Sequence, residues 1–378
     1  MRIAQISPLF ESVPPRLYGG TERIVSYLTE ALVSDGHDVT LFASGDSVTA
    51  ARLVSPCAEA LRLASKETDQ AAVHMLMLEQ VMAEADQFDV LHFHWDYMHF
   101  PVVSRSQRPN LTTLHGRLDL PAWKSVTSHF ASMPLVSISF SQRAQLPDAN
   151  WLGTVYHGIR ADCLAAGSGT GGYLAFVGRL APEKGVDRAI EIAKRAGMPL
   201  KIAAKIAEDD RSYFKKVVRP LLDDPLIEYV GEVDERGKGE FLAAAAALLF
   251  PIDWPEPFGL VQIEAMACGT PVIAFRRGSV PEVVKEGVTG FVVENVDEAV
   301  EAVGRVAGFD RVACRVEFDA SFSVGRMASD YTALYEQVIE REPIGRPRGW
   351  TAERRIVGSL SSAPASVGMV EPEIASGT

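Results

Sequence analysis

Two series of short apolar runs, each alternating with stretches of helical apolar spacing, constrain this chain more than any other feature. The first series begins with a buried strand at Ile3–Ser7 and a helix at Thr21–Val33, whose apolar residues fall on one face. The further strands expected in this series are Asp38–Ala43, Val90–Phe93, Leu111–Leu114, Leu135–Ser139 and Thr154–Tyr156. Strands that alternate with helices form parallel sheets, so this half of the chain predicts an α/β domain.

A second α/β series follows the glycine-rich segment 165–172. Its expected helices are Val186–Ala196 and Glu235–Ala246. Its expected strands are Tyr173–Val177, Leu200–Ala204, Ile227–Val230, Ala247–Phe250 and Pro271–Phe275. The segment 165–172 has the composition of a flexible linker, which predicts a hinge between two domains. The length of 378 residues also fits two cores of about 150–170 residues each.

The end of the chain divides into a helix and a polar tail. Apolar residues at helical spacing predict a last helix at Ser323–Ile339, and Pro, Gly, Ser and Arg dominate from Glu342 onward. The predicted organisation is a first domain over residues 1–165, a second over 166–322, a helix over 323–340 and a disordered tail over 341–378.

Composition and charge exclude several classes of function. The net charge is −12 with acidic and basic residues interspersed, whereas nucleic-acid binding needs clustered Lys and Arg. The same balance disfavours docking on an anionic membrane, and no apolar run reaches the roughly 20 residues of a membrane span. No signal-peptide core is visible and the four cysteines lie far apart, so we expect a cytoplasmic protein.

Three segments carry candidate chemistry, and the first is the long loop that ends at Gly19 and Gly20. These glycines let a ligand approach the backbone, and the helix that follows directs unpaired N–H groups at it, as an anion requires. The pattern is not G-x-G-x-x-G, so a nicotinamide cofactor is not indicated. A tight helix entry capped by Thr21 explains the same residues without a ligand.

The second segment is a strand-to-helix turn that carries two cations, Arg179 and Lys184. Two cations at such a turn can neutralise a departing diphosphate, a task that many enzymes give to a divalent metal. An exposed turn with ordinary surface charges explains these two residues, taken alone, equally well.

The third segment, 255–266, combines a turn with the start of a helix. Its backbone amides would face a phosphate and add the attraction of the helix dipole. The residues that supply these amides are Phe258, Gly259 and Leu260. Glu256, just before the helix, could reach a sugar, and Glu264, near its second turn, could bind a ribose diol.

A histidine-rich strand supports two different hypotheses. His92 and His94 alternate and so share a face of the strand, where they could bind a metal as in some hydrolases. Asp96 and His99 could add further ligands. In the other hypothesis the strand enters a cleft, and His94 and Asp96 contact a substrate at its mouth. Both hypotheses remain open at this point.

Three motifs together resemble the family 4 (group 1) retaining glycosyltransferases, namely Val177–Lys184, Glu256–Ala274 and Gly278–Val283. The resemblance covers nearly the whole chain before the tail. It implies an α/β architecture called GT-B, in which two Rossmann-like domains face each other across a cleft and the C-terminal helix crosses back to the first domain. The N-terminal domain would hold the acceptor, and the C-terminal domain the nucleotide sugar.

The resemblance also implies roles for single residues. Arg179 and Lys184 would bind the diphosphate, Glu256 the donor sugar and Glu264 the ribose. His115 matches the family histidine beside the reacting sugar. The catalytic set would then be His115, Arg179, Lys184 and Glu256, and the remaining donor contacts would come from Gly19, Gly20, Val233, Phe258, Gly259 and Leu260. Two residues depart from the family pattern: Ser279 replaces a common second glycine, and His157 a common asparagine.

These observations predict a retaining hexosyltransferase without a metal cofactor, which uses a nucleotide-diphosphate sugar such as UDP-glucose. Its partners would be that donor and a small soluble acceptor, a saccharide or another small molecule with a free hydroxyl. The residues expected near the acceptor are Glu11, Tyr18, His94 and Asp96. The alternatives are a metal-dependent hydrolase that uses His92 and His94, a non-catalytic nucleotide-sugar binding protein of the same fold, and an enzyme that hydrolyses or epimerises the nucleotide sugar itself.

Overall fold

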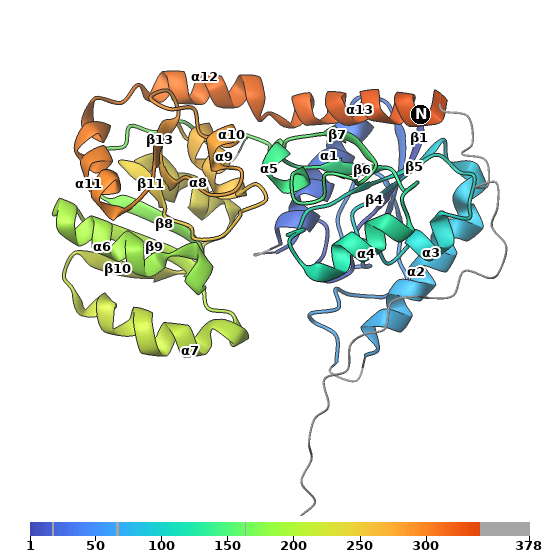
Figure 1. Ribbon diagram of the computed structural model, residues 1–378, viewed down its shortest axis with the longest axis horizontal. Coiled ribbons are helices and arrows are strands. Elements are labelled where there is room, and N and C mark those ends of the chain that lie inside the picture. The colour runs from blue at the N-terminus through green and yellow to red at the C-terminus, as the bar shows by residue number, and fades with distance from the viewer. Residues whose placement is uncertain (17–18, 66–67, 163, 341–378) are drawn as a thin grey trace, which may run out of the picture. The chain divides into compact units, whose positions relative to one another are not determined.

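The computed structural model describes residues 1–16, 19–65, 68–162 and 164–340, which form two β-sheets flanked by helices (Figure 1). The strands of the first sheet are β1 (Arg2–Ile6), β2 (Asp38–Phe42), β3 (Arg52–Val54), β4 (Val90–Phe93), β5 (Asn110–Thr113), β6 (Leu135–Ser137) and β7 (Trp151–Thr154). The strands of the second are β8 (Leu174–Arg179), β9 (Leu200–Lys205), β10 (Ile227–Gly231), β11 (Ala247–Phe250), β12 (Val272–Phe275) and β13 (Gly290–Val293).

Helices connect the strands of both sheets. Around the first sheet they are α1 (Gly20–Ser34), α2 (Gln70–Glu84), α3 (Phe100–Val103), α4 (Pro121–His129) and α5 (Phe140–Arg143). Around the second they are α6 (Val186–Ala196), α7 (Arg211–Tyr213), α8 (Glu235–Ala244), α9 (Leu260–Ala267), α10 (Val280–Val283), α11 (Val296–Arg305) and α12 (Arg311–Ser321). The chain continues from α12 into a long last helix, α13 (Val324–Glu340).

Both sheets are entirely parallel and share one topological feature. The strand order is β3-β2-β1-β4-β5-β6-β7 in the first sheet and β10-β9-β8-β11-β12-β13 in the second. In each sheet the first strand in the chain lies between its two neighbours, so the winding reverses direction beside it. Ligands of parallel α/β sheets bind beyond the carboxyl ends of the strands at such a reversal. The predicted α/β architecture of two parallel sheets is confirmed.

Burial explains why most strands could be predicted from the sequence. All residues of β4 are buried, and in β1 every residue after Arg2 is buried. Strands covered by helices on both faces consist of continuous apolar runs rather than alternating ones. The short strands β3 and β13 were not predicted, and β7 begins at Trp151 rather than at Thr154. These strands lie at sheet edges, where one neighbouring strand defines them more than their own sequence does.

The glycine-rich segment 165–172 does not have the contacts of a free hinge. The amides of Gly167, Gly169 and Gly171 donate to the carbonyl oxygens of Cys268, Ala243 and Ala244. Arg311 of α12 adds a hydrogen bond from Nε to the carbonyl of Gly167 (2.8 Å). The expectation of a flexible linker was therefore wrong for this segment, because small residues allow it to pack on α8 and on the end of α9.

The last helix returns to the first sheet, as the GT-B architecture requires. Figure 1 shows α12 and α13 following each other, α12 beside the elements of the second sheet and α13 beside those of the first. α13 contacts α1 and β4, and Tyr331 and Tyr335 on its inner face are fully buried. The prediction of a crossing C-terminal helix is confirmed. The predicted tail, 341–378, lies outside the described residues.

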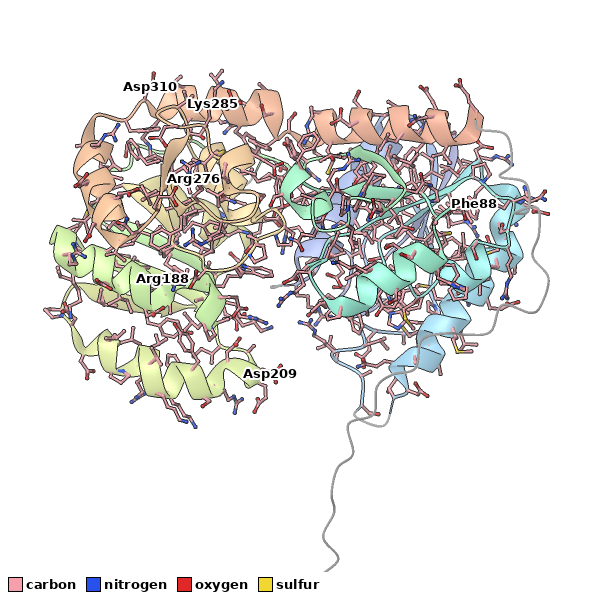
Figure 2. All side chains as sticks on the ribbon, in the orientation of Figure 1. Phe88, Arg188, Asp209, Arg276, Lys285 and Asp310 are labelled. Atoms are coloured by element: carbon pink, nitrogen blue, oxygen red, sulfur yellow. The ribbon has the colours of Figure 1, made fainter. Side chains whose placement is uncertain are left out.

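Side chains fill the space between helices and sheets in both halves (Figure 2). Arg188, labelled there, lies on α6 and donates from Nε to the carbonyl of Pro251 (3.0 Å). The amide of Asp253 donates to the carbonyl of Glu183 (2.9 Å). These two bonds tie α6 and the turn before it to the loop after β11. Across the described ranges, none of the helices is both long enough and apolar enough to cross a bilayer.

Candidate functional site

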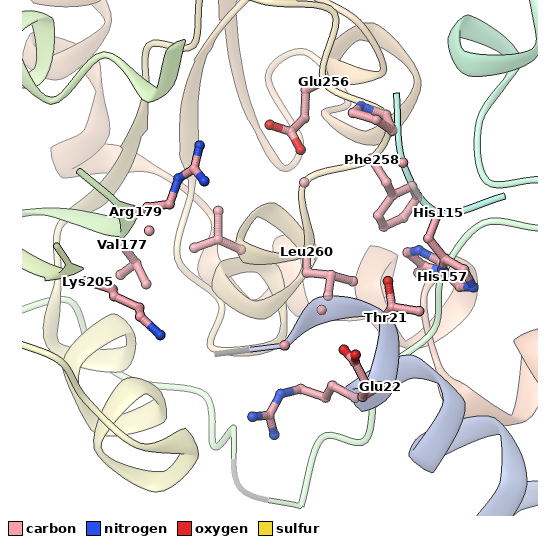
Figure 3. A pocket seen from close by; sticks show the side chains of 18 of the residues that line it. Thr21, Glu22, His115, His157, Val177, Arg179, Lys205, Glu256, Phe258 and Leu260 are labelled. Carbon is pink, nitrogen blue, oxygen red and sulfur yellow. The ribbon is translucent and has the colours of Figure 1, made fainter. Parts of the chain in front are cut away.

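A cavity of about 640 Å³ lies where the carboxyl ends of strands from both sheets meet. Its volume falls in the range of small-molecule sites. Figure 3 shows Arg179 and Glu256 on the side of the second sheet, and His115 and His157 opposite them. The first sheet and α1 contribute Glu11, Gly19, Gly20, His94, Asp96 and His115 to the cavity wall, and the second half contributes Arg179, Lys184, Val233, Glu256, Phe258, Gly259, Leu260 and Glu264. Apart from Tyr18, which lies outside the described residues, every residue predicted for the catalytic, donor and acceptor sites lines one cavity.

The start of α9 forms a natural anion site at one end of this cavity. Gly259 takes a left-handed conformation with φ of 79°, which lets the chain turn sharply into the helix at Leu260. The first amides of a helix have no acceptor within it, and the helix dipole adds positive potential there. Phe258 is buried at the turn and holds it against the protein interior. A phosphate in the cavity would meet these amides.

The two predicted cations lie in the wall, and each is paired with a carboxylate. Lys184 forms an ion pair with Glu256, which also accepts a hydrogen bond from Nε1 of Trp254 (2.8 Å). Nζ of Lys184 stands 4.8 Å from the centre of the Trp254 ring, a cation–π distance. Arg179 pairs with Glu183 (2.6 Å) and Asp210 (3.1 Å). These contacts hold both cations in place, so an anion would meet them already oriented.

Another buried ion pair lies between α8 and α9, and the sequence analysis did not predict it. Lys238 on α8 pairs with Glu264 on α9, and both side chains are less than a fifth exposed. Val233 lines the cavity just before α8. Lys238 was missed because no motif surrounds it: the glycine-rich helix α8 brings it to Glu264 only in the folded chain.

Glu235, at the start of α8, connects this region to the first half of the chain. Its carboxylate accepts hydrogen bonds from Nη1 of Arg23 (2.5 Å) and from the hydroxyl of Tyr27, both on α1. Arg23 lines the cavity as well. The wall of the site is therefore continuous from α8 to α1.

The predicted catalytic histidine, His115, lies beside other histidines rather than alone. Its Nε2 is 2.9 Å from Nδ1 of His94, and its ring stacks on that of His157 at a centroid distance of 5.3 Å. Burial lowers the pKa of His115 to about 3 and holds the pKa values of His94 and His157 well below the usual range. All three imidazoles are therefore neutral at physiological pH. His157 was noted in the sequence only as a departure from the family pattern.

The proposed metal pair does not have the geometry of a metal site. Both nitrogens of His92 are within 2.8 Å of protein hydroxyls, those of Tyr335 and Thr113. Both nitrogens of His94 are likewise engaged, with His115 and with Gln5. Within the described ranges no three metal-ligating side chains gather in one place. The lone pairs that a metal would need at His92 and His94 are already used in hydrogen bonding.

The end of the cavity nearest the first sheet is acidic. Glu22, in the first turn of α1, is 6% exposed, and burial raises the pKa of its carboxyl to about 7. Glu11 pairs with Arg62 (2.9 Å), and both line the cavity. Asp96 follows β4 with φ of 25°, and it is the one non-glycine residue of the described chain in the left-handed region. Such strain concentrates at functional sites. The sequence indicated Glu11 and Asp96 but not Glu22.

Comparison with solved structures places the fold in a known class. Sucrose-phosphate synthase from Thermosynechococcus elongatus aligns with a TM-score of 0.73 at 19% identity, over 89% of this chain and 99% of that chain. Anabaena Alr3699/HepE, solved in complex with UDP and glucose, aligns with a TM-score of 0.69 at 15% identity, over 89% and 99% of the two chains. The fold is that of the GT-B glycosyltransferases.

The sequence families divide the chain as the two sheets do. The family described as Glycosyltransferase Family 4 matches residues 18–156, and Glycosyl transferases group 1 matches residues 167–307. The chain therefore belongs to the group 1 glycosyltransferases. Alpha-maltose-1-phosphate synthase from Mycobacterium tuberculosis is 26% identical over 357 residues, 81% of this chain and 88% of that protein. The chain spans only 46% and 62% of the length of two other curated relatives that it matches.

Proposed function

We propose that this protein transfers a hexose, with retention of anomeric configuration, from a UDP-sugar to a hydroxyl of a small acceptor. The observation that carries the proposal is the arrangement at one end of the cavity, where Arg179, Lys184 and the N-terminus of α9 converge. That arrangement is complementary to a diphosphate. Glu256, which is paired with Lys184, would bind the sugar next to that diphosphate.

Each group then has a role in a front-face displacement. The acceptor oxygen bonds to the anomeric carbon on the face from which the diphosphate leaves, and the bond from that carbon to the phosphate oxygen breaks. The departing phosphate oxygen takes the proton of the acceptor hydroxyl, so no protein base is required. Arg179, Lys184 and the amides of α9 bind the negative charge that grows on the phosphate more strongly than they bind the ground state. Fixed protein cations would perform here the task of a divalent metal.

The choice of donor and acceptor rests on different observations. HepE was solved with UDP and glucose, which supports UDP-glucose as the first donor to test. The acceptor would enter at the acidic end of the cavity, beside Glu11, Glu22 and Asp96. Carboxylates accept hydrogen bonds from hydroxyl groups and repel phosphates, so we propose an uncharged acceptor that carries hydroxyls.

Calorimetric titration with UDP, GDP and ADP, each with and without EDTA, tests the donor site. We expect UDP to bind selectively and equally in both conditions. Binding of none of the three would contradict the donor site, and loss of binding in EDTA would contradict metal independence. Incubation with UDP-glucose and a panel of neutral sugars, followed by NMR of the product anomer, tests retention.

The same incubation without any acceptor distinguishes the remaining alternatives. Stoichiometric binding with no product would indicate a non-catalytic binding protein. Free glucose or an epimerised donor, formed as fast as any transfer product, would indicate that the nucleotide sugar itself is the substrate.

A further inference from the structure

A continuous chain of buried hydrogen bonds links the cavity to the C-terminal helix. From the cavity inward its members are His115, His94, Gln5, Tyr335, His92, Thr113 and Tyr331. They come from β1, from β4 and β5 and the residues just after these two strands, and from α13. Successive polar atoms are between 2.7 and 3.0 Å apart. Gln5, His92, Thr113 and both tyrosines are fully buried. A chain of this kind is cooperative, since the role of each atom depends on its neighbour.

Gln5 decides the direction of the hydrogen bonds on the side of the cavity. A hydroxyl can donate or accept, and a neutral imidazole can carry its proton on either nitrogen, but an amide has one donor end and one acceptor end. Nε2 of Gln5 donates to the hydroxyl of Tyr335 (2.8 Å). Oε1 of Gln5 therefore accepts from Nε2 of His94 (2.7 Å). The orientation of the amide therefore fixes the tautomer of His94.

On the side of the cavity, the orientation of the Gln5 amide also determines the tautomer of His115. His94 carries its proton on Nε2, so its Nδ1 is an acceptor, and burial keeps this ring neutral by lowering its pKa. Nε2 of His115, 2.9 Å away, must donate to it. Nδ1 of His115 is then left without a proton. This atom is buried and has no hydrogen-bond partner among the described residues, although its ring lines the cavity.

On the side of α13 the chain continues to Tyr331. The hydroxyl of Tyr335, which accepts from Gln5, is 2.8 Å from Nδ1 of His92. Nε2 of His92 is 2.8 Å from the hydroxyl of Thr113, and that hydroxyl is 3.0 Å from the hydroxyl of Tyr331. Two tyrosines of the crossing helix are thus part of the system that orders His115.

We propose that Gln5 and His94 are positioning residues, which hold His115, a residue of the cavity wall, as the Nε2–H tautomer and so leave its bare Nδ1 as an acceptor for a substrate hydroxyl. The proposal rests on the proposed function, since that hydroxyl belongs to the sugar or to its acceptor. Burial lowers the pKa of His115 to about 3, so Nδ1 accepts a hydrogen bond but does not remove the proton. This agrees with a displacement in which the leaving phosphate takes that proton.

Nitrogen-15 NMR of the full-length protein, labelled at histidine, tests the tautomer directly. A protonated and a bare imidazole nitrogen resonate far apart, so the spectrum near neutral pH identifies each ring's form. We expect His115 with its proton on Nε2, and we expect the Nδ1 signal to move when UDP-glucose is added. A proton on Nδ1 of His115, or on both nitrogens, would overturn the proposal.

Two variants of one residue separate positioning from folding. In His94→Phe the acceptor for His115 is gone, whereas in His94→Asn the side-chain oxygen can replace Nδ1. We expect His94→Phe to mix the tautomers of His115 and to lower kcat about 10²-fold, because displacement of a reacting group by about 1 Å costs that much. His94→Asn should restore the tautomer and most of the rate, and both variants should bind UDP like the wild type.

The readouts also keep this inference distinct from the proposed function. An unchanged His115 spectrum in His94→Phe, with UDP binding intact, would show that His94 does not position the ring. Absence of any sugar transfer in the wild-type protein would instead contradict the proposed function, while the tautomer measurement would still stand by itself.

Discussion

Glu22 is a single residue whose surroundings make the stability of the protein depend on pH. Burial, together with the nearby charge of Glu11, raises the pKa of its carboxyl from 4.5 to about 7 in the folded protein. Below the pKa of the unfolded state, the carboxyl is protonated in both states and does not change the free energy of unfolding. As the pH rises toward the folded pKa, the unfolded state ionises first, and the folded state becomes progressively less stable.

We therefore predict that Glu22→Gln raises the free energy of unfolding at about pH 8 by about 1–3 kcal/mol and leaves it unchanged at about pH 4. Urea denaturation of both proteins across this range measures the difference. Glu240→Gln, at an exposed position of α8, is the matched control and should show no such pH dependence. An equal effect of Glu22→Gln at both ends of the range would contradict the elevated pKa.

At Lys184, one substitution can remove the charge of the side chain with little change in its shape. Lys184→Met changes the length of the side chain by one atom and removes the cation that we propose to bind the leaving phosphate. We expect kcat to fall by about 10²–10³, the usual effect of deleting one transition-state contact. Arg195→Met removes an exposed cation of α6 that pairs with Asp297 outside the cavity, and it should keep full activity. Wild-type turnover in a folded Lys184→Met protein would remove Lys184 from the mechanism.

At the scale of the elements, the loop after β12 supports the loop that carries Glu256. Gly278 has φ of 54°, and a Cβ at this position would lie 2.3 Å from the carbonyl oxygen of Glu256 and 2.4 Å from its amide nitrogen. The amide of Ser279 donates to the same carbonyl (3.0 Å). The backbone of Glu256 is thus held by direct contact with a residue that has no side chain.

We predict that Gly278→Ala raises the KM for the donor sugar by about tenfold or more, because one ångström of displacement at a reacting group is enough. Gly287→Ala is the matched control, since Gly287 has φ of 72° and its Cβ would meet nothing within 4 Å. Both variants should lose about 1–2 kcal/mol of stability from the left-handed backbone. Steady-state kinetics separate them: only Gly278→Ala should impair the donor, and equal kinetics would contradict the contact argument.

At the scale of the whole described chain, a second carboxylate besides Glu235 joins the two halves. Glu282 of α10 accepts hydrogen bonds from the amides of Phe140 (2.7 Å) and Ser141 (2.6 Å) and from the hydroxyl of Tyr156 (2.9 Å). The donors belong to the first sheet's side of the cavity, and the acceptor to the second. This contact favours the arrangement in which both walls of the site are close together.

We predict that Glu282→Ala shifts the protein toward an open form, with a larger radius of gyration and a several-fold higher KM for the donor. Each of the three hydrogen bonds to this charged group contributes about 1.5–3 kcal/mol to the closed arrangement, and Glu282→Ala removes all three. Small-angle X-ray scattering measures the radius. Glu286→Ala removes a carboxylate that accepts only from Val292 of its own half, so it should leave the radius unchanged. The same radius in both variants would contradict the role of Glu282.

The sequence by itself determined the features that depend on neighbouring residues. Strands buried on both faces, such as β1 and β4, could be predicted because most of their residues are apolar. The turn before α9 and the cations at Arg179 and Lys184 could also be predicted, since turn chemistry and helix dipoles act over a few residues. Their resemblance to one family then indicated that these segments meet in one site.

Only the tertiary structure decided which polar side chains become partners. The sequence does not show that Lys238 pairs with Glu264, or that Gln5 lies between His94 and Tyr335, 330 residues away in the chain. It predicted a hinge at 165–172, where the glycines instead pack on α8. The physical reason is that a hydrogen bond between buried groups is specified by the packing of whole elements, and local periodicity determines which face is buried but not what that face meets.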